Sequence, residues 1–243
     1  YEIAACLVGS EMCIRDRHAL ERITGAVKNS YGFVYGFHKA KGHTQYPSAD
    51  SFARMLIDLN KCVAPKLYVM DGIVAMEGNG PGSGDPVPMN VLLMSTDPVA
   101  LDSVFSRLVY LKPEMVPTNY HGEKMGLGTW KEEEITLLTP DGEISMAEAV
   151  KKYGNPAFNV DRTEVRKNIW TRMAGALNIF QKKPYIEADK CVRCGICVQS
   201  CPVPGKAVDF RKGKGKPPVY DYRKCIRCFC CQEMCPKKAI KVK

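Results

Sequence analysis

The sequence predicts two units of different fold class. The first is an α/β domain with a mostly parallel sheet, because strand-like and helix-like patterns alternate between residues 48 and 153. The second is a small α+β module, in which one cysteine pattern occurs twice near the carboxyl end. A chain of 243 residues has room for one domain of about 150 residues and another of about 60.

Residues 1–17 do not read as the beginning of a folded domain. They do not start with Met, and LVGSEMCIRDR has neither helical nor strand periodicity. The stretch CLVGSEMCIRDR (Cys6–Arg17) looks like a translated sequencing-adapter read-through. We therefore expect residues 1–17 to be non-native, exclude them from fold reasoning, and expect the native beginning of the next domain to be missing.

The following domain, residues 18–160, opens with a glycine-punctuated stretch that is too broken for a long helix. Such a loop can present a basic face to an anion, formed by Lys28, His38, Lys39, Lys41 and His43. Helices are then predicted over 48–63, 97–111 and 145–153, and strands over 66–71, 90–95 and 134–139. Ser48 or Asp50 is expected to cap the first helix, and Asp97 the second, with Pro98 in its first turn.

Each of the two longer helices has one apolar face. In the first, Phe52, Met55, Leu56 and Leu59 follow the helical spacing, and in the second Leu101, Val104, Phe105 and Leu108 do so. Helices of this kind cover a sheet, which supports the layered α/β prediction.

A glycine-rich stretch separates the first two predicted strands. Gly78, Gly80, Gly82 and Gly84 alternate with other residues, and Asp71, Glu77 and Asp85 flank them. The stretch is not a Walker loop, because it lacks GK[ST]. It is not a dinucleotide fingerprint either, because a strand rather than a helix follows it. Such a loop at the carboxyl end of a strand can bring backbone amides up to a ligand, whereas the alternative is a tight structural connection.

Three segments of this domain, TGAVKNSYG, DGIVAMEGNGPGSGDPV and STDPVALD, resemble the domain of unknown function 362 family. The resemblance covers His18–Thr139 and implies a ligand site, but no substrate or reaction. Its shared polar positions correspond to His18, Lys28, Asn29, His38, Lys39, Asp71, Glu77, Asn79, Asp97 and Asp102. We expect Asp71, Glu77 and Asn79 to contact an unknown small-molecule ligand, with His38 and Lys39 as further candidates. No catalytic residue can be assigned.

Residues 161–183 are predicted to form an amphipathic linker helix that ends at Pro184. Its apolar side consists of Val165, Ile169, Met173, Leu177 and Phe180, and Lys and Arg occupy the remainder. The helix can pack against the α/β domain or lie on a membrane surface. No stretch approaches 18 apolar residues, so no transmembrane segment is predicted.

Two runs in residues 184–243 share the pattern C-x2-C-x2-C-x3-C-P. They contain Cys191, Cys194, Cys197 and Cys201, and then Cys225, Cys228, Cys231 and Cys235. In bacterial two-cluster iron–sulfur proteins the fourth cysteine of each run ligates the other cluster. We therefore expect one [4Fe–4S] cluster at Cys191, Cys194, Cys197 and Cys235, and a second at Cys225, Cys228, Cys231 and Cys201.

Zinc and disulfides are the alternatives for these cysteines. Structural zinc sites use separated C-x2-C pairs, and disulfides require an oxidising compartment.

From Lys183 to Lys243 the chain resembles the bacterial two-cluster ferredoxin domain, which implies its α+β fold. Cys230 matches no ligand position, and we interpret it as a buried side chain beside a cluster. Many free thiolates indicate a reducing interior, so we expect a cytoplasmic location.

The net charge of +9 is concentrated in the cysteine-rich module, where residues 184–243 hold 14 Lys and Arg against 5 Asp and Glu. Part of this charge offsets the negative clusters. The remainder lies in Arg211–Lys216, a predicted hairpin tip. The tip can be a solvated loop or can contact an acidic redox partner, and nucleic acid is disfavoured because no aromatic residues are interleaved with its charges.

The leading functional hypothesis is a single-electron carrier that serves a redox reaction or partner at the α/β domain, with a redox protein as its partner. The alternative is a non-catalytic binding or redox-sensing protein whose clusters stabilise the fold, since a module of about 60 residues buries little apolar surface. The sequence leaves open whether the chain is an enzyme.

Overall fold

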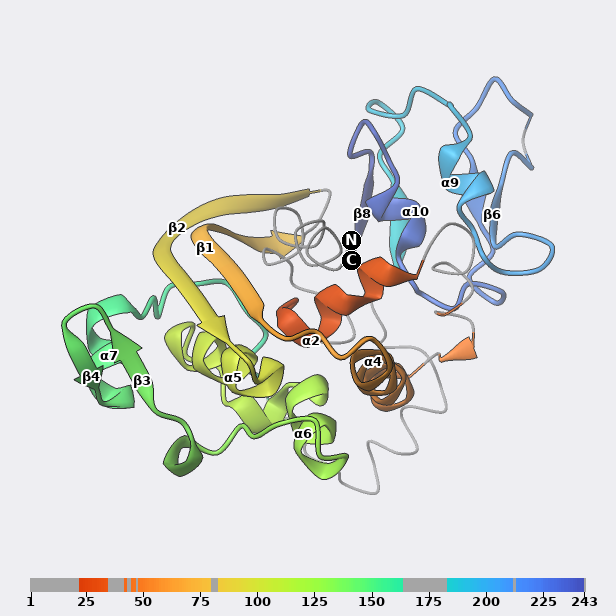
Figure 1. Cartoon of the computed structure of the whole chain (residues 1–243). Helices are drawn as coiled ribbons and strands as arrows, with labels where there is room; N and C mark the ends of the chain where they lie inside the picture. The colour runs from red at the N-terminus through yellow and green to blue at the C-terminus, as the bar shows by residue number, and fades with distance from the viewer. Residues whose placement is uncertain are drawn as a thin grey trace. The chain divides into compact units, whose positions relative to one another are not determined.

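The structure is a computed structural model that describes residues 22–34, 42, 45–46, 48–79, 83–163, 183–211 and 213–242. The chain divides into two compact units (Figure 1). The first extends to residue 162 apart from residues 43–45, and the second contains the remainder. Residues 1–17, His18, His38, Lys39, Lys41, His43 and the linker residues 164–182 lie outside the described residues, so the predictions made for them stay predictions.

In the part of the chain that the structure describes, the first unit combines helices with two antiparallel hairpins. Its elements are α2 (Ala26–Asn29), η1 (Ser30–Phe33), α4 (Ala49–Val63), β1 (Tyr68–Asn79), β2 (Ser83–Ser95), α5 (Pro98–Leu108), η2 (Pro113–Met115), α6 (Pro117–Lys124), η3 (Glu132–Glu134), β3 (Leu137–Thr139), β4 (Gly142–Ile144) and α7 (Met146–Tyr153). The mixed helix and strand content was predicted correctly. The predicted mostly parallel sheet is wrong for the described residues, because β1–β2 and β3–β4 are both antiparallel.

The long β1–β2 ribbon replaces the predicted glycine-rich loop. Its register runs from Tyr68 opposite Ser95 to Asn79 opposite Ser83, with an irregularity between Gly72 and Val74. Only residues 80–82 connect the two strands, and a parallel pair would need a crossover of a dozen or more residues. The short connection therefore enforces the antiparallel pairing, and most of the predicted loop is strand.

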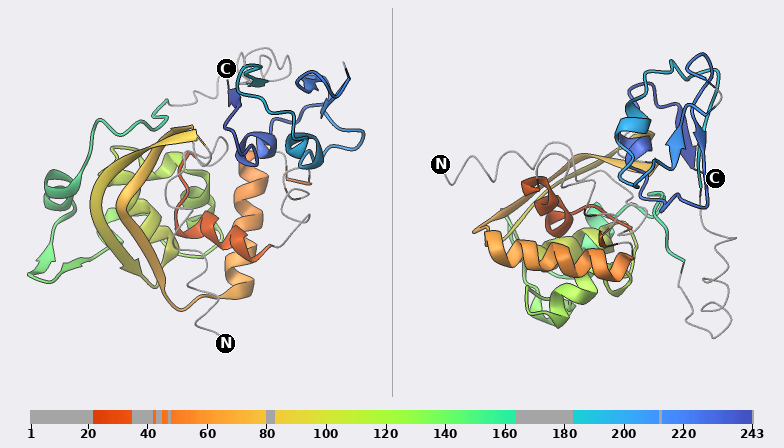
Figure 2. Two further views of the ribbon diagram at one scale, coloured as in Figure 1. Left: turned by 90° about the horizontal axis from the view of Figure 1, so that it is seen from above. Right: turned by 90° about the vertical axis from the view of Figure 1, so that its right-hand side faces the viewer.

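The ribbon packs one face onto α5, over which it curves in Figures 1 and 2. Met70, Ala75 and Val91 on this face are buried in one core with Leu101 and Phe105 of α5. A side chain at Gly72 would come within 2.8 Å of the Val91 side chain, so glycine permits the close approach of the two strands.

The helix predictions are largely confirmed. Ser48 caps α4 through a capping box, and Phe52 and Leu56 of the predicted face are buried, while Met55 and Leu59 are half-buried. Asp97 caps α5 with Pro98 in its first turn, and Leu101, Val104, Phe105 and Leu108 are all buried, as the spacing predicted. α7 starts from a capping box at Ser145.

Within its described residues, the second unit is built on two short antiparallel pairs and two one-turn helices. Its elements are β5 (Pro184–Ile186), α9 (Ile196–Gln199), β6 (Val208–Asp209), β7 (Val219–Tyr220), α10 (Cys230–Glu233) and β8 (Ile240–Val242). β5 pairs with β8, and β6 pairs with β7. The basic stretch around residues 211–216 therefore lies in the connection of the β6–β7 hairpin, where the composition placed it.

Candidate metal centre

Cysteines from both runs gather around two cavities in the second unit. The first cavity, about 360 Å³ including space open to solvent, is lined by Cys191, Cys194, Cys197 and Cys235. The second, about 300 Å³ on the same measure, is lined by Cys201, Cys225, Cys228 and Cys231. Each group therefore contains three cysteines of one run and the fourth cysteine of the other.

The two runs adopt the same local backbone. The residue before the second cysteine has a positive φ in both, at Arg193 (60°) and Arg227 (59°). The residue after it also has a positive φ, 79° at Gly195 and 57° at Phe229, and each begins a one-turn helix, α9 or α10. This turn directs the first three cysteines of each run toward one cavity.

The fourth cysteine of each run is held by equivalent backbone contacts. The Ala207 amide donates to Cys201 Sγ at 3.3 Å, and the Ala239 amide donates to Cys235 Sγ at 3.3 Å. At the second cavity, the Tyr220 hydroxyl lies 3.0 Å from Cys231 Sγ. Once that sulfur is a thiolate, only the hydroxyl can donate, so Tyr220 stabilises negative charge there.

Burial changes the pKa of three of these thiols. Burial raises the pKa of Cys197 to about 11 and that of Cys231 to about 12, and neighbouring cysteines add to both effects. Burial likewise raises the pKa of Cys225. Without a bound metal these thiols keep their protons at neutral pH, so loading the cavities must release protons.

The donor set fits [4Fe–4S] clusters, which are held by four cysteine thiolates each. Among the residues that the structure describes, no three His, Cys, Asp or Glu side chains form a group that could hold a single metal ion. Cys230 is buried and lines neither cavity. The grouping of the eight cysteines is the crossed one that the spacing predicts, and ligation itself stays a prediction.

The candidate ligand residues of the first unit are not brought together. Asp71 and Glu77 both lie on β1, six residues and roughly 20 Å apart along the strand. Asp71 accepts a hydrogen bond from the Ile73 amide at 3.0 Å, and Glu77 accepts one from the Asn159 amide at 2.7 Å. Asn79 ends β1, and its side chain is not among those described. The structure therefore adds no support for a site at these residues.

Two other carboxylates have roles that sequence reasoning missed wholly or in part. Asp102, which is 1% exposed, accepts hydrogen bonds from the Ala26 amide at 2.5 Å and the Val27 amide at 3.1 Å. Asp97, beyond capping α5, accepts from the Thr129 amide at 2.9 Å. Both carboxylates thus fix a distant backbone segment. The sequence pointed to them only through the predicted cap at Asp97 and through the family resemblance, which includes both positions.

Comparison with known families agrees with the division into two units. Residues 12–107 match the family model described as Domain of unknown function (DUF362), and residues 183–236 match that of the 4Fe-4S dicluster domain. The chain joins a DUF362 segment to a 4Fe-4S dicluster domain. The predicted resemblance to these two families is therefore confirmed. The DUF362 match begins within the segment expected to be non-native, so that expectation stays a prediction.

A curated relative covers only part of this arrangement. The thylakoid-associated protein sll1697 of Synechocystis sp. is 41% identical over 111 residues, which are 45% of this chain and 35% of that protein. The chain thus spans about a third of its relative's length. No solved structure matches the chain. No helix in the described part of the DUF362 segment or the dicluster domain is long and apolar enough to cross a membrane.

Proposed function

We propose that this protein is a single-electron carrier that holds two [4Fe–4S] clusters and serves a redox reaction or a partner at the DUF362 segment. The 4Fe-4S dicluster match supports an iron–sulfur electron-transfer role. The observation that carries the proposal is the gathering of eight cysteines into two groups of four across the two runs. When bound, each cluster exchanges one electron, usually at low potential.

The residues of the dicluster domain have separate tasks in this proposal. Cys191, Cys194, Cys197 and Cys235 hold one cluster, and Cys201, Cys225, Cys228 and Cys231 hold the other. The amides of Ala207 and Ala239 and the Tyr220 hydroxyl donate to cysteine sulfurs and stabilise their negative charge. The positive charge of the domain acts in the same direction over longer range.

Two double variants test the crossed grouping. Cys191→Ala with Cys235→Ala removes two ligands of one group, so about four irons should remain bound. Cys191→Ala with Cys201→Ala removes one ligand from each group and should lower iron content further, with loss of both reduced-state electron spin resonance signals. Cys230→Ala is the control and should retain eight irons. Equal iron content in the two double variants, or the reverse order, would refute the grouping.

A structural role for the clusters is the second candidate, and the packing of the domain favours it. Cys197, Cys201 and Cys231 are themselves part of its buried core, with Val208 and Ile240. Loss of a cluster should therefore unfold a domain of this size. Reversible reduction and reoxidation without loss of iron favours the carrier. Clusters that cannot be reduced without loss of the fold favour the structural role.

A further inference from the structure

We propose that the exposed end of the first cysteine cavity is a docking surface for a redox protein with an acidic surface. This surface, which we call the cationic rim, consists of Val192, Arg193, Cys194 and Lys237. The inference rests on the proposed function, because a docking surface at this place serves electron transfer only if a cluster lies behind it.

The two cavities differ in their access to solvent. Cys194 of the first cavity is exposed, and the neighbouring Val192 is 55% exposed. The cysteines of the second cavity are all buried or half-buried. A partner can therefore approach a cysteine ligand directly at the first cavity, and the distance that an electron must travel is shortest there.

The two cavities also differ in charge. Arg193 and Lys237 line the first cavity, whereas no charged residue lines the second. Both side chains are exposed, and neither has an ion-pair or hydrogen-bond partner among the described residues. The nearby Lys190 differs, because it pairs with Glu187 at 2.6 Å and so contributes little net charge.

The internal repeat indicates that the fold does not require these charges. The position equivalent to Lys237, two residues after the fourth cysteine, is Val203 in the other run. The position equivalent to Arg193 is Arg227, which has the same φ but is half-buried and has a partner. The turn that carries Arg193 and Arg227 is therefore built equally well with an exposed or a half-buried arginine, and the second run has a valine where the first cavity has Lys237.

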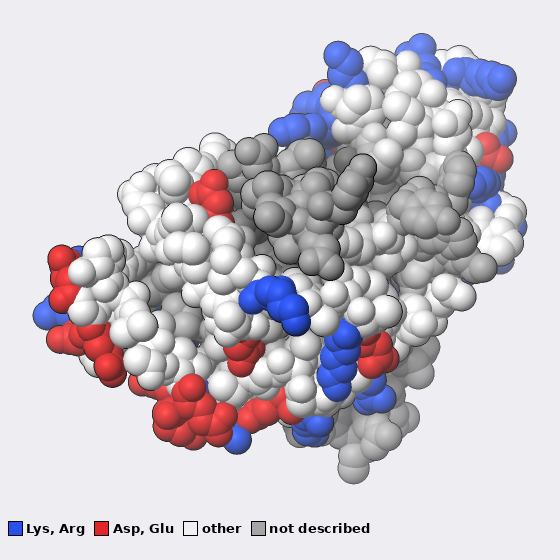
Figure 3. All heavy atoms as spheres, viewed as in Figure 1, with Lys and Arg blue, Asp and Glu red and all other residues white. Residues whose placement is uncertain are grey.

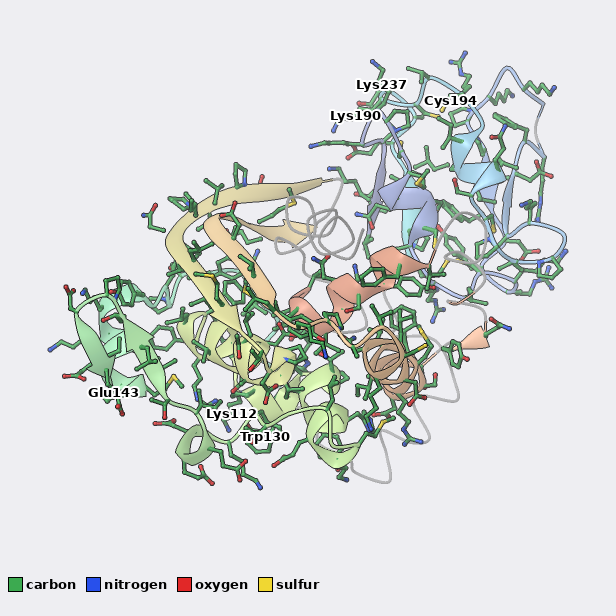
Figure 4. The ribbon with its side chains drawn as sticks, in the orientation of Figure 1. Lys112, Trp130, Glu143, Lys190, Cys194 and Lys237 are labelled. Carbon is green, nitrogen blue, oxygen red and sulfur yellow. The ribbon has the colours of Figure 1, made fainter. Side chains whose placement is uncertain are left out.

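An exposed apolar residue beside side chains of one charge is a typical arrangement for transient recognition. The apolar centre loses water on contact, and the surrounding charge steers an oppositely charged partner and sets its orientation. Figure 3 shows Lys and Arg side chains along the edges of the visible face of this unit, and Figure 4 labels Cys194, Lys190 and Lys237 within it. The charge at the rim selects an acidic partner.

Binding to a purified acidic flavodoxin tests the surface. Arg193→Gln with Lys237→Gln should weaken binding about tenfold or more at low ionic strength, and the difference should disappear near 0.5 M salt. Lys214→Gln with Lys216→Gln removes the same charge from the exposed β6–β7 connection and should change the affinity less than twofold. Lys237→Glu alone leaves the residues between Cys191 and Cys194 unchanged and should weaken flavodoxin binding to a similar extent.

The rate of reduction separates this proposal from the proposed function. Reduced methyl viologen, a small cation, should reduce the wild-type protein and the rim variant at similar rates, whereas reduced flavodoxin should reduce the rim variant about tenfold more slowly. If methyl viologen fails to reduce the protein reversibly, both proposals fall. If it succeeds but the two pairs of variants weaken flavodoxin binding equally, or if the wild type prefers vesicles containing anionic lipid, only the docking surface is refuted.

Discussion

Asp102 offers a test of how the DUF362 segment is held together. Its carboxylate is buried against α2 and accepts hydrogen bonds from the amides of Ala26 and Val27. Burial raises the pKa of Asp102 to about 7, because the desolvation of the charged form outweighs these two hydrogen bonds, and the negative charge of Asp97 contributes in the same direction. In the unfolded chain an aspartate titrates near 3.9.

The sign of the effect follows from this difference. Between about pH 4 and pH 7 the folded state binds more protons than the unfolded state, so the free energy of unfolding falls as the pH rises. The slope is about 1.4 kcal/mol per pH unit and flattens above about pH 7. The free energy of unfolding therefore falls by about 3 kcal/mol between pH 5 and pH 8, nearly all of it below pH 7. The stabilising form of Asp102 is therefore the protonated one. Asp102→Asn resembles that form at every pH and should remove the dependence.

Urea unfolding followed by the fluorescence of Trp130 measures the effect, in a Trp170→Phe background so that the signal comes from the first unit. Between pH 5 and pH 8, the free energy of unfolding of the wild-type protein should fall by about 3 kcal/mol relative to that of Asp102→Asn. Asp58→Asn, at an exposed position on α4, should follow the wild type. A constant difference between wild type and Asp102→Asn would mean that Asp102 is ionised throughout, and the reasoning would be wrong.

Two further predictions concern single contacts. Gly25→Ala should destabilise the first unit by about 2 kcal/mol or more in the same urea assay, because the added Cβ would come within 1.9 Å of the buried aspartate, whereas Gly32→Ala, with open space around it, should be nearly neutral. Tyr220→Phe should lower the reduction potential of the second cluster by about 20–60 mV in a spectroscopic titration, because it removes a hydrogen bond to Cys231. Tyr222→Phe, whose hydroxyl donates to a backbone carbonyl instead, should leave the potential unchanged.

The dicluster domain was more predictable from sequence than the DUF362 segment. Its cysteine spacing is a local constraint, since three thiols at intervals of three residues must share one turn, and the structure gathers them with the fourth cysteine of the other run. The pairing of β5 with β8 joins the segments that precede the first cysteine run and follow the second.

The antiparallel pairing of β1 with β2 was harder to predict from the sequence. Gly78 and Gly84 face each other in the ribbon, although alternating glycines are more typical of loops than of strands. Pro86 and Pro88 lie within β2, which is tolerated because a two-stranded ribbon has open outer edges. The propensities of these residues therefore predicted a loop, and pairing with the neighbouring strand overrode them.

The roles of Asp97 and Asp102 show what local reasoning cannot reach. The capping of α5 by Asp97 depends only on the next three residues and was predicted. The bonds from Thr129 to Asp97 and from Ala26 to Asp102 join segments 32 and 76 residues apart, so no periodicity reveals them. Two polar positions that the family resemblance suggested as parts of a ligand site therefore have structural partners.

The same distinction applies inside the dicluster domain, where a repeated backbone surrounds two unequal cavities. The repeat fixes where the sulfurs lie, but the residues that surround the sulfurs differ between the two cavities. They include two exposed cations at the first cavity and the Tyr220 hydroxyl at the second. Cations and solvent access favour the reduced state at the first cavity, and the phenolic hydrogen bond does so at the second. Because these contributions come from different residues, substitution at Lys237 should shift mainly the potential of the first cluster, and substitution at Tyr220 mainly that of the second.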